Sequence, residues 1–154
     1  MMKLASEVLQ SFAGRTLATA ESCTGGGIGH ILTSVPGSSA VFKGGIISYC
    51  NEIKHRLLGV DMRLLNRVGA VSAPVAEAMA LGACKALQTD AAISVTGLAG
   101  PDGDEYGNPV GTVFIGFADK LGAISREYHF TGDRESIRRQ AIEAALQLAL
   151  EQAK

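Results

Sequence analysis

The sequence predicts a single α/β domain in which helices cover both faces of a mixed, mostly parallel sheet. The chain has 154 residues, enough for one ordinary domain (residues 1–154) and too few for two. Segments with helical spacing of apolar residues alternate with short apolar runs, the pattern of parallel strands joined by helices. Two late runs are separated only by a tight turn, so we expect one hairpin that makes the sheet mixed.

The first fifty residues predict two helices and two strands. Apolar residues recur at helical spacing over 4–12, and Gly14 ends that helix. Residues 16–20 form a strand-like run, and a glycine cluster then leads into a helix whose apolar face lies over 28–35. A second strand is expected within 42–50.

The middle of the chain predicts three helices in succession. A short helix begins near Asn51, and another short helical piece covers 62–67. Ser72 is a good N-cap, and Pro74 suits the first turn of a long, alanine-rich helix that reaches about Leu87.

The last third predicts three strands and a final helix. A buried strand over 91–95 leads into a long loop over 97–109 that is rich in glycine, proline and acidic residues. The strands of the hairpin follow at 110–118 and 123–130. The final helix is expected over 134–152.

The final helix also raises the question of oligomeric state. Asp133 is its expected N-cap. Its apolar side is formed by Ile137, Ala141, Leu146 and Leu150. This surface either supports a homodimer or is buried within the domain.

Composition and charge exclude several classes of protein. The hydrophobic fraction is 47% and the formal net charge is −1, so a well-buried core is expected and a basic surface for nucleic acid is not. The N-terminal segment reads as an amphipathic helix rather than a signal peptide, and no apolar run is long enough for a membrane span. The three cysteines show no CxxC spacing. We therefore expect a cytoplasmic protein without disulfides.

Three loops follow predicted strands, at 21–27, 49–54 and 96–104. Ligands of open α/β sheets bind at the carboxyl ends of the strands. We therefore expect the functional residues to lie where these three loops meet.

Ser22 in the first loop is a candidate nucleophile. It lies between a strand and the glycine cluster at 25–27, where the start of a helix offers unpaired N–H groups for an oxyanion or a phosphate. Glycine also permits close approach of the backbone to a substrate. The alternative is that Ser22 or Thr24 only caps the helix. The segment lacks the GxSxG elbow, which disfavours an ordinary α/β-hydrolase.

A serine nucleophile needs a base to accept its proton. None of His30, His55 and His129 has an orienting carboxylate pattern or metal-ligand spacing, so structural or surface roles are expected for them. Lys54 would lie in the first turn of a helix, where the dipole disfavours a cation and favours an uncharged amine. A solvated helix lysine is the alternative. No metal constellation is present, and we expect activity in the presence of a chelator.

Two further segments could bind a substrate. The glycine-rich run from Thr96 to Gly103 could present backbone donors to a ligand, or it could be a plain surface loop. Arg134 and Arg138 are four residues apart on the final helix, so they share a face. Together they could hold a phosphate, or they could belong to a solvated helix surface.

These segments together resemble the CinA C-terminal domain family, the nicotinamide-nucleotide amidases, over nearly the whole chain. The motifs that carry the resemblance are AESCTGG at 20–26, SYCNEIK at 48–54, LGV at 58–60, GAVS at 69–72, TGLAGPDG at 96–103, PVGTV at 109–113 and GDRESIRRQA at 132–141.

The resemblance implies a three-layer α/β/α sandwich with a mixed, mostly parallel five-stranded sheet. It also implies hydrolysis of nicotinamide mononucleotide to nicotinic acid mononucleotide and ammonia, with no cofactor. By motif match, Ser22 is the nucleophile, Lys54 the base and Tyr49 a third hydroxyl partner. Cys50 stands where the family motif more often has serine. The residues expected to bind substrate are Thr24, Gly25, Gly26, Thr96, Gly97, Gly100, Asp102, Arg134 and Arg138.

Three alternatives stay open at this point. Cys23 is the rival nucleophile, because it is the neighbouring thiol. The domain could instead be a non-catalytic module that binds pyridine nucleotides. It could also be an interaction protein linked to DNA uptake, although the neutral charge gives no support for direct contact with DNA.

Overall fold

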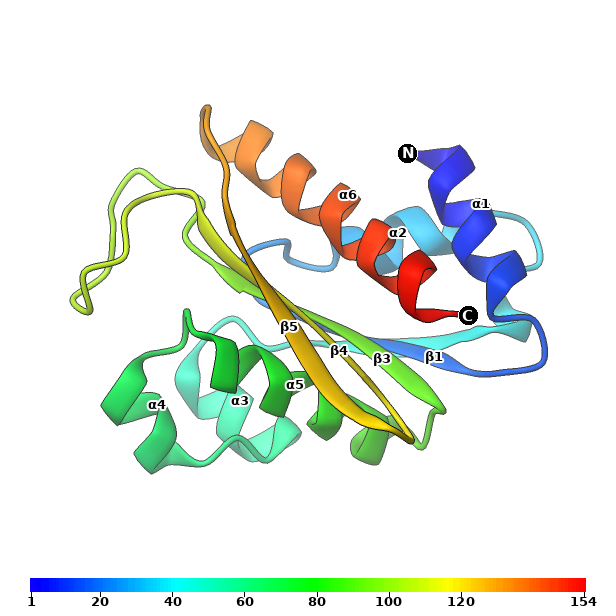
Figure 1. Cartoon of the computed structure of the whole chain (residues 1–154), viewed down its shortest axis with the longest axis horizontal. Coiled ribbons are helices and arrows are strands. Elements are labelled where there is room, and N and C mark those ends of the chain that lie inside the picture. The colour runs from blue at the N-terminus through cyan, green and yellow to red at the C-terminus, as the bar shows by residue number, and fades with distance from the viewer.

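A five-stranded mixed sheet divides the molecule into three layers, as the computed structural model of residues 1–154 shows (Figure 1). The strand order is β2-β1-β3-β4-β5. β1 pairs in parallel with β2 and β3, whereas β4 is antiparallel to β3 and β5, so four of the five strands run in one direction. The predicted sheet is confirmed. Its strands are β1 Leu17–Glu21, β2 Phe42–Ile47, β3 Ala91–Gly97, β4 Thr112–Asp119 and β5 Gly122–His129.

Helices cover both faces, as predicted. α1, α2 and α6 pack together on one face, and α3 and α4 pack with α5 on the other (Figure 1). None of these helices has the length and apolar character that crossing a bilayer would require. The helices are α1 Met2–Ser11, α2 Gly27–Thr33, α3 Asn51–Leu58, α4 Met62–Val68, α5 Ala73–Leu87 and α6 Arg134–Gln152, with a 3₁₀ turn at Ser38–Ala40.

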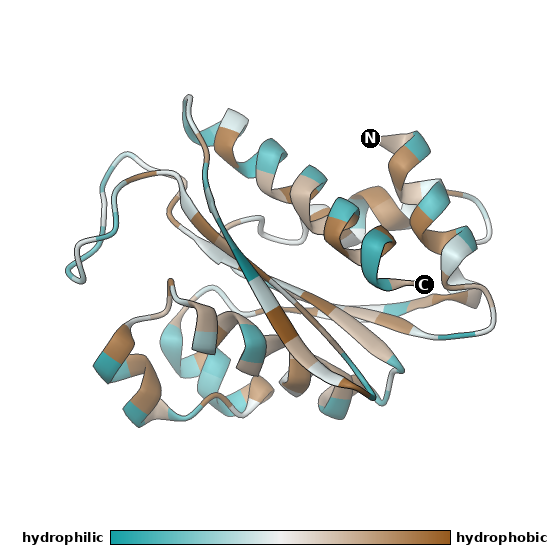
Figure 2. Ribbon diagram, in the orientation of Figure 1, coloured by the Kyte–Doolittle hydropathy of each residue, from teal (hydrophilic) through white to brown (hydrophobic).

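The larger part of the core lies between the sheet and the layer of α1, α2 and α6. Figure 2 shows the hydropathy of each residue along these elements. β3 and β4 are buried along nearly their whole length, whereas the edge strand β5 alternates between half-buried and exposed residues. The apolar residues of α6 are buried within the domain, including Ile137, Ala141 and Leu146. The apolar side of this helix therefore gives no support for a dimer, and the oligomeric state stays a prediction.

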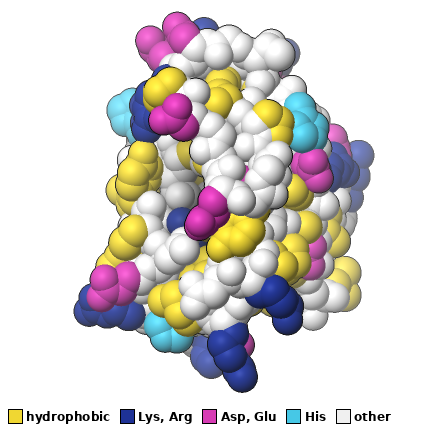
Figure 3. All heavy atoms as spheres, turned by 90° about the vertical axis from the view of Figure 1, so that its left-hand side faces the viewer, with side chains coloured by type: hydrophobic (Ala, Val, Ile, Leu, Met, Phe, Trp, Pro, Cys, Tyr) yellow, Lys and Arg dark blue, Asp and Glu magenta, His cyan; other side chains and the backbone are white.

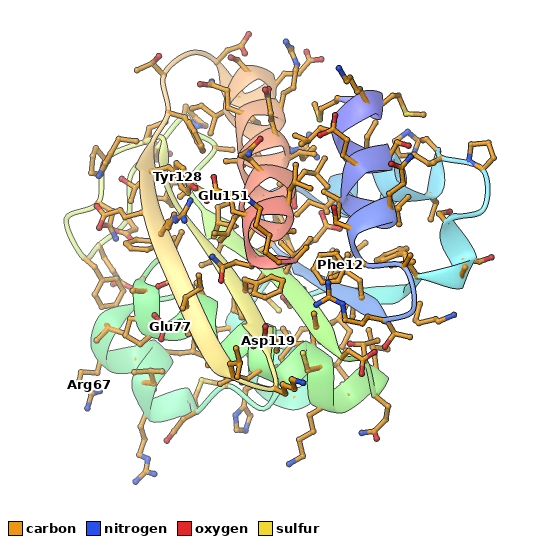
Figure 4. The ribbon with its side chains drawn as sticks, turned by 45° about the vertical axis from the view of Figure 1, so that its right-hand side comes forward. Phe12, Arg67, Glu77, Asp119, Tyr128 and Glu151 are labelled. Carbon is orange, nitrogen blue, oxygen red and sulfur yellow. The ribbon has the colours of Figure 1, made fainter.

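Side chains on β5 connect the edge of the sheet to both helical layers. Ser125 donates a hydrogen bond to Glu77 of α5 at 2.6 Å, and Arg126 pairs with Glu151 of α6 at 2.6 Å. Figure 4 labels Glu77 and Glu151 on either side of this strand. Because the ion pair is about 40% exposed, it contributes about 0–1 kcal/mol and mainly orients the strand.

Helix α5 packs closely against its neighbours through glycine positions. A Cβ added at Gly82 of α5 would collide with the main-chain carbonyl of Leu58 at the end of α3. A Cβ added at Gly116 of β4 would lie 2.6 Å from the carbonyl of Ala76 in α5. The contact at Gly82 fixes α3, and with it Lys54, against α5, and the contact at Gly116 fixes α5 against the sheet.

Of the two predicted helix caps, one forms the expected side-chain hydrogen bond and the other does not. Asp133 caps α6 as expected, because its carboxylate accepts a hydrogen bond from the N–H of Ser136 at 2.9 Å. Ser72 is the N-cap of α5, but its hydroxyl donates to the carbonyl of Gly69 at 2.9 Å instead of capping the helix. That bond closes the turn before α5. Pro74 lies in the first turn of the helix, where its missing N–H needs no capping partner.

Candidate active site

The three loops that follow β1, β2 and β3 meet at one edge of the sheet and enclose a pocket of about 280 Å³. Figure 3 views the molecule from this side and shows a hollowed surface. The expectation that these loops meet is thus confirmed. The pocket is lined by Ser22, Cys23, Tyr49, Asn51, Lys54, Ala70, Val71, Thr96, Gly97, Leu98, Ala99, Gly100, Asp102 and Arg134.

Ser22 and Lys54 are in direct contact in this pocket. The Nζ of Lys54 lies 3.1 Å from the Oγ of Ser22 and 2.8 Å from the carbonyl oxygen of Ser48. Lys54 is only 2% exposed and Ser22 only 7% exposed. The two residues are 32 positions apart, and they meet because β1 and β2 are adjacent parallel strands that end at the same edge. A solvated helix lysine, the alternative interpretation, is wrong.

Burial lowers the pKa of the Lys54 amine below its usual value of 10.5, and the nearby thiols of Cys50 and Cys23 offset part of that shift. The hydrogen-bond partners of the amine are a hydroxyl and a carbonyl, and neither is a carboxylate that would stabilise the ammonium form. An amine with a lowered pKa next to a serine hydroxyl is the arrangement that proton abstraction from the serine needs.

The neighbouring thiol is poorly suited to act as a nucleophile. Cys23 is 5% exposed, and burial raises the pKa of its thiol to about 11. Arg138 and Lys54 lower that pKa only in part. Because the thiolate is the reactive form of cysteine, the thiol is almost fully protonated and weakly reactive near neutral pH.

Glu21 organises the turn that carries Ser22, although the sequence analysis gave it no role. Its carboxylate is 2% exposed and accepts hydrogen bonds from the hydroxyl of Thr24 at 2.6 Å and from the N–H groups of Ile28 at 2.9 Å and Gly29 at 3.0 Å. Gly26 is the N-cap of α2, so neither Ser22 nor Thr24 caps this helix. The signal in the sequence was an acidic residue at the end of an otherwise apolar strand.

The free backbone donors lie earlier in this turn than expected. Glu21 occupies the N–H groups at the start of α2, and the N–H groups of Gly25 and Gly27 donate to the carbonyls of Ser22 and Thr24. The N–H groups of Gly25 and Gly27 are therefore not available to a substrate. The N–H groups of Cys23 and Thr24 donate to no other residue.

Four residues expected to bind substrate lie outside the pocket lining, because they contact other parts of the protein. Thr24 is buried and bonded to Glu21. Arg138 donates to the carbonyls of Cys23 at 2.9 Å and Thr24 at 3.3 Å and does not line the pocket, whereas Arg134 does. The other two, Gly25 and Gly26, have positive φ angles of 59° and 99°, which explains glycine at these positions.

Tyr49 and Arg134 lie together at the mouth of the pocket. Arg134 donates to the hydroxyl of Tyr49 at 2.9 Å and to the carbonyl of Gly100. Tyr49 is 58% exposed and makes no hydrogen bond to Ser22 or Lys54. The structure thus places this hydroxyl at the rim, apart from the contact between the serine and the amine.

The remaining expected binding residues also line the pocket. They are Thr96, Gly97, Gly100 and Asp102. The hydroxyl of Thr96 donates to the carbonyl of Ala70 at 2.9 Å, which joins β3 to the segment before α5. Asn51, Ala70 and Val71 also line the pocket. They lie in the motifs SYCNEIK and GAVS, but no role was expected for them because their side chains carry no catalytic chemistry.

None of the three histidines lines the pocket, in agreement with the structural or surface roles expected for them. His30 is exposed, His55 bonds to the carbonyl of Val60 at 2.8 Å, and His129 bonds to Glu127 at 2.6 Å. No group of three or more histidine, cysteine, aspartate or glutamate residues is arranged to hold a metal ion. All three cysteines are free thiols.

Comparison with known proteins places this geometry in a family. The family model described as the CinA C-terminal domain matches residues 1–153. The chain is 46% identical to the nicotinamide-nucleotide amidohydrolase PncC of Escherichia coli, over 99% of this chain and 94% of that protein. It is 54% identical to a CinA-like protein of Geobacter metallireducens, over 81% of this chain but only 30% of that longer protein.

Solved structures give the same result. A competence/damage inducible protein of Agrobacterium tumefaciens has a TM-score of 0.92 at 37% identity and covers 97% of this chain and 94% of that chain. A CinA superfamily protein of Klebsiella pneumoniae has a TM-score of 0.95 at 31% identity and covers 99% and 96%. With sequence and fold matching over almost its full length, the chain belongs to the CinA C-terminal domain family.

Proposed function

We propose that this chain hydrolyses the carboxamide of nicotinamide mononucleotide to give nicotinic acid mononucleotide and ammonia, with Ser22 as nucleophile and Lys54 as base. The observation that carries the proposal is the buried contact of 3.1 Å between the amine and the hydroxyl inside a pocket. The similarity to the Escherichia coli protein named nicotinamide-nucleotide amidohydrolase supports the choice of substrate.

The chemistry follows from the state of the two groups. Neutral Lys54 accepts the proton of Ser22 Oγ while that oxygen attacks the carboxamide carbon. The lysine ammonium then returns the proton to the nitrogen of the tetrahedral intermediate, the C–N bond breaks, and ammonia leaves. Water, activated by the same amine, hydrolyses the resulting ester, which releases the carboxylate product and restores the serine.

Tyr49 is the proposed third hydroxyl partner, and it assists departure of ammonia. This role requires its hydroxyl to turn from Arg134 toward the departing nitrogen when substrate is bound. Arg134 at the rim is the proposed contact for the phosphate, because its guanidinium is a charged donor within the lining. The loop from Thr96 to Asp102 then holds the ribose.

The decisive experiment measures ammonia release from nicotinamide mononucleotide in a coupled assay with wild-type protein and the Ser22→Ala variant. Turnover by the wild type and its loss in the variant would support the proposal. A Ser22→Ala protein with normal turnover would refute the assignment of Ser22 as the nucleophile.

The same preparations test the two other functions. Binding of the nucleotide by calorimetry without ammonia from the wild type would favour a non-catalytic binding module. Neither binding nor turnover would favour an interaction protein. We infer the cytoplasm as the compartment, because free thiols suit a reducing environment.

A further inference from the structure

Arg138 is joined to the nucleophile turn, residues 22–26, from outside the pocket. It lies on α6, and its Nε and Nη2 donate to the carbonyls of Cys23 at 2.9 Å and Thr24 at 3.3 Å, more than a hundred residues away in the chain. A Cβ added at Gly25 would lie 3.3 Å from its Nη2. Arg138 is half-buried and takes part in no ion pair. Its hydrogen bonds are therefore directed at two main-chain carbonyls alone.

Those bonds fix the direction of the peptide groups. In a trans peptide unit the carbonyl and the N–H point in opposite directions. The carbonyl of Cys23 points to Arg138, so the N–H of Thr24 in the same unit points away from it. The carbonyl of Ser22 is held by the N–H of Gly25 at 3.0 Å, which fixes the N–H of Cys23 in the same way.

Both N–H groups are free to act as donors. Neither donates to another residue, whereas Glu21 and the turn carbonyls occupy the N–H groups of Gly25 and of the first residues of α2. Ser22 and Cys23 line the pocket and Arg138 does not. The side of the turn that faces away from Arg138 is therefore the side where the substrate carbonyl would meet Ser22 Oγ.

We infer that the N–H groups of Cys23 and Thr24 form the oxyanion hole of this site, and that Arg138 is a positioning residue that fixes the direction of the Thr24 N–H. The inference rests on the proposed function, since an oxyanion forms only if Ser22 attacks a carbonyl. On this inference, Arg138 contributes to stabilisation of the transition state and does not bind the phosphate of the substrate. Preorganised backbone donors stabilise charge that develops in the transition state, so their misalignment lowers kcat and leaves KM unchanged.

The experiment compares Arg138→Met and Arg138→Lys with Arg139→Ala, a matched control. Arg139 is exposed, adjacent in the same helix and makes no side-chain hydrogen bond or ion pair. We expect Arg138→Met to lose about 10- to 100-fold in kcat, somewhat less than the loss of a complete oxyanion donor. Arg138→Lys should give an intermediate kcat, because an ammonium can bond to one carbonyl but cannot provide the two-pronged contact.

Two further measurements separate positioning from phosphate binding or general damage to the fold. All variants should keep the wild-type KM and the wild-type Kd for nicotinic acid mononucleotide, measured by calorimetry. Midpoints of thermal unfolding report on the fold, and Arg138→Lys is informative even if Arg138→Met unfolds.

Unchanged kcat in both Arg138 variants, with an active wild type, would overturn this inference alone. A raised KM and a weaker Kd at unchanged kcat would overturn it in favour of a phosphate contact. A wild-type protein that releases no ammonia would overturn the proposed function itself.

Discussion

Replacing Lys54 with methionine tests the proposed base most directly. Methionine has a similar length but no amine, and Lys54 Nζ is the only side-chain group within hydrogen-bonding distance of Ser22 Oγ. General bases contribute about 10²- to 10⁴-fold in rate, equivalent to about 2.7–5.5 kcal/mol in the activation barrier. We expect a loss near the upper end, because no second group can accept the proton.

The same substitution should leave the protein folded. The folded-state pKa of Lys54 lies below 10.5, so the unfolded chain binds more protons between these two values and stability rises with pH across that window. Below the folded-state pKa the protein buries an ammonium ion, and Lys54→Met removes the full cost of that burial. The variant also leaves the buried carbonyl of Ser48 without its donor, which costs about 1–3 kcal/mol. The two changes have opposite signs and partly offset each other.

The assay is single-turnover and steady-state ammonia release, measured with the unfolding midpoint of the same preparation. Lys54→Arg is the matched control, since it keeps a cation that cannot act as a base near neutral pH. Both variants should be inactive. A folded Lys54→Met protein that keeps more than about a tenth of the wild-type kcat would refute the assignment, because that loss is well below the range for a general base.

Four other predictions concern the same pocket. Ser22→Ala should abolish turnover and Cys23→Ala should keep it, because the thiol with a pKa of about 11 is protonated; the opposite pair of results would identify the cysteine as nucleophile. The kcat/KM should rise with pH to a plateau as Lys54 loses its proton, with an apparent pKa below 10.5, and a limb still climbing beyond that pH would contradict it. Arg134→Ala should raise KM for the nucleotide by about tenfold or more, because a charged contact is lost. Tyr49→Phe should lower kcat, because the hydroxyl assists the departure of ammonia. A Tyr49→Phe protein that changes only KM would instead give Tyr49 a role in holding Arg134.

The fold was accessible from the sequence because each element carries its own periodic pattern. Helix α6 and its cap at Asp133 follow from local spacing, and so does the hairpin of β4 and β5. The start of β4 was placed two residues early, because the apolar pattern begins at Val110 while the ladder with β5 begins at Thr112. Pairing across a sheet is not encoded in the local pattern of one strand.

The site could be predicted only in part from the sequence, because contacts between distant segments are not encoded in local patterns. The edge where Ser22 and Lys54 meet follows from the rule for carboxyl ends of strands, but their contact depends on the pairing of β1 with β2. Arg138 shares a helix face with Arg134, yet its guanidinium bonds to backbone carbonyls that no spacing in α6 reveals. Glu21 was missed because burial turns a surface-type residue into a helix cap.

The close packing at Gly82 has a consequence for mutational tolerance. This residue does not line the pocket, but any side chain there must push against the end of α3. The first turn of that helix carries Lys54, and a small displacement of α3 would break the hydrogen bond between Lys54 Nζ and Ser22 Oγ. Gly82→Ala should therefore behave like an active-site substitution in a genetic screen, although Gly82 lies outside the pocket. Catalytic activity should fall more than the amount of protein expressed.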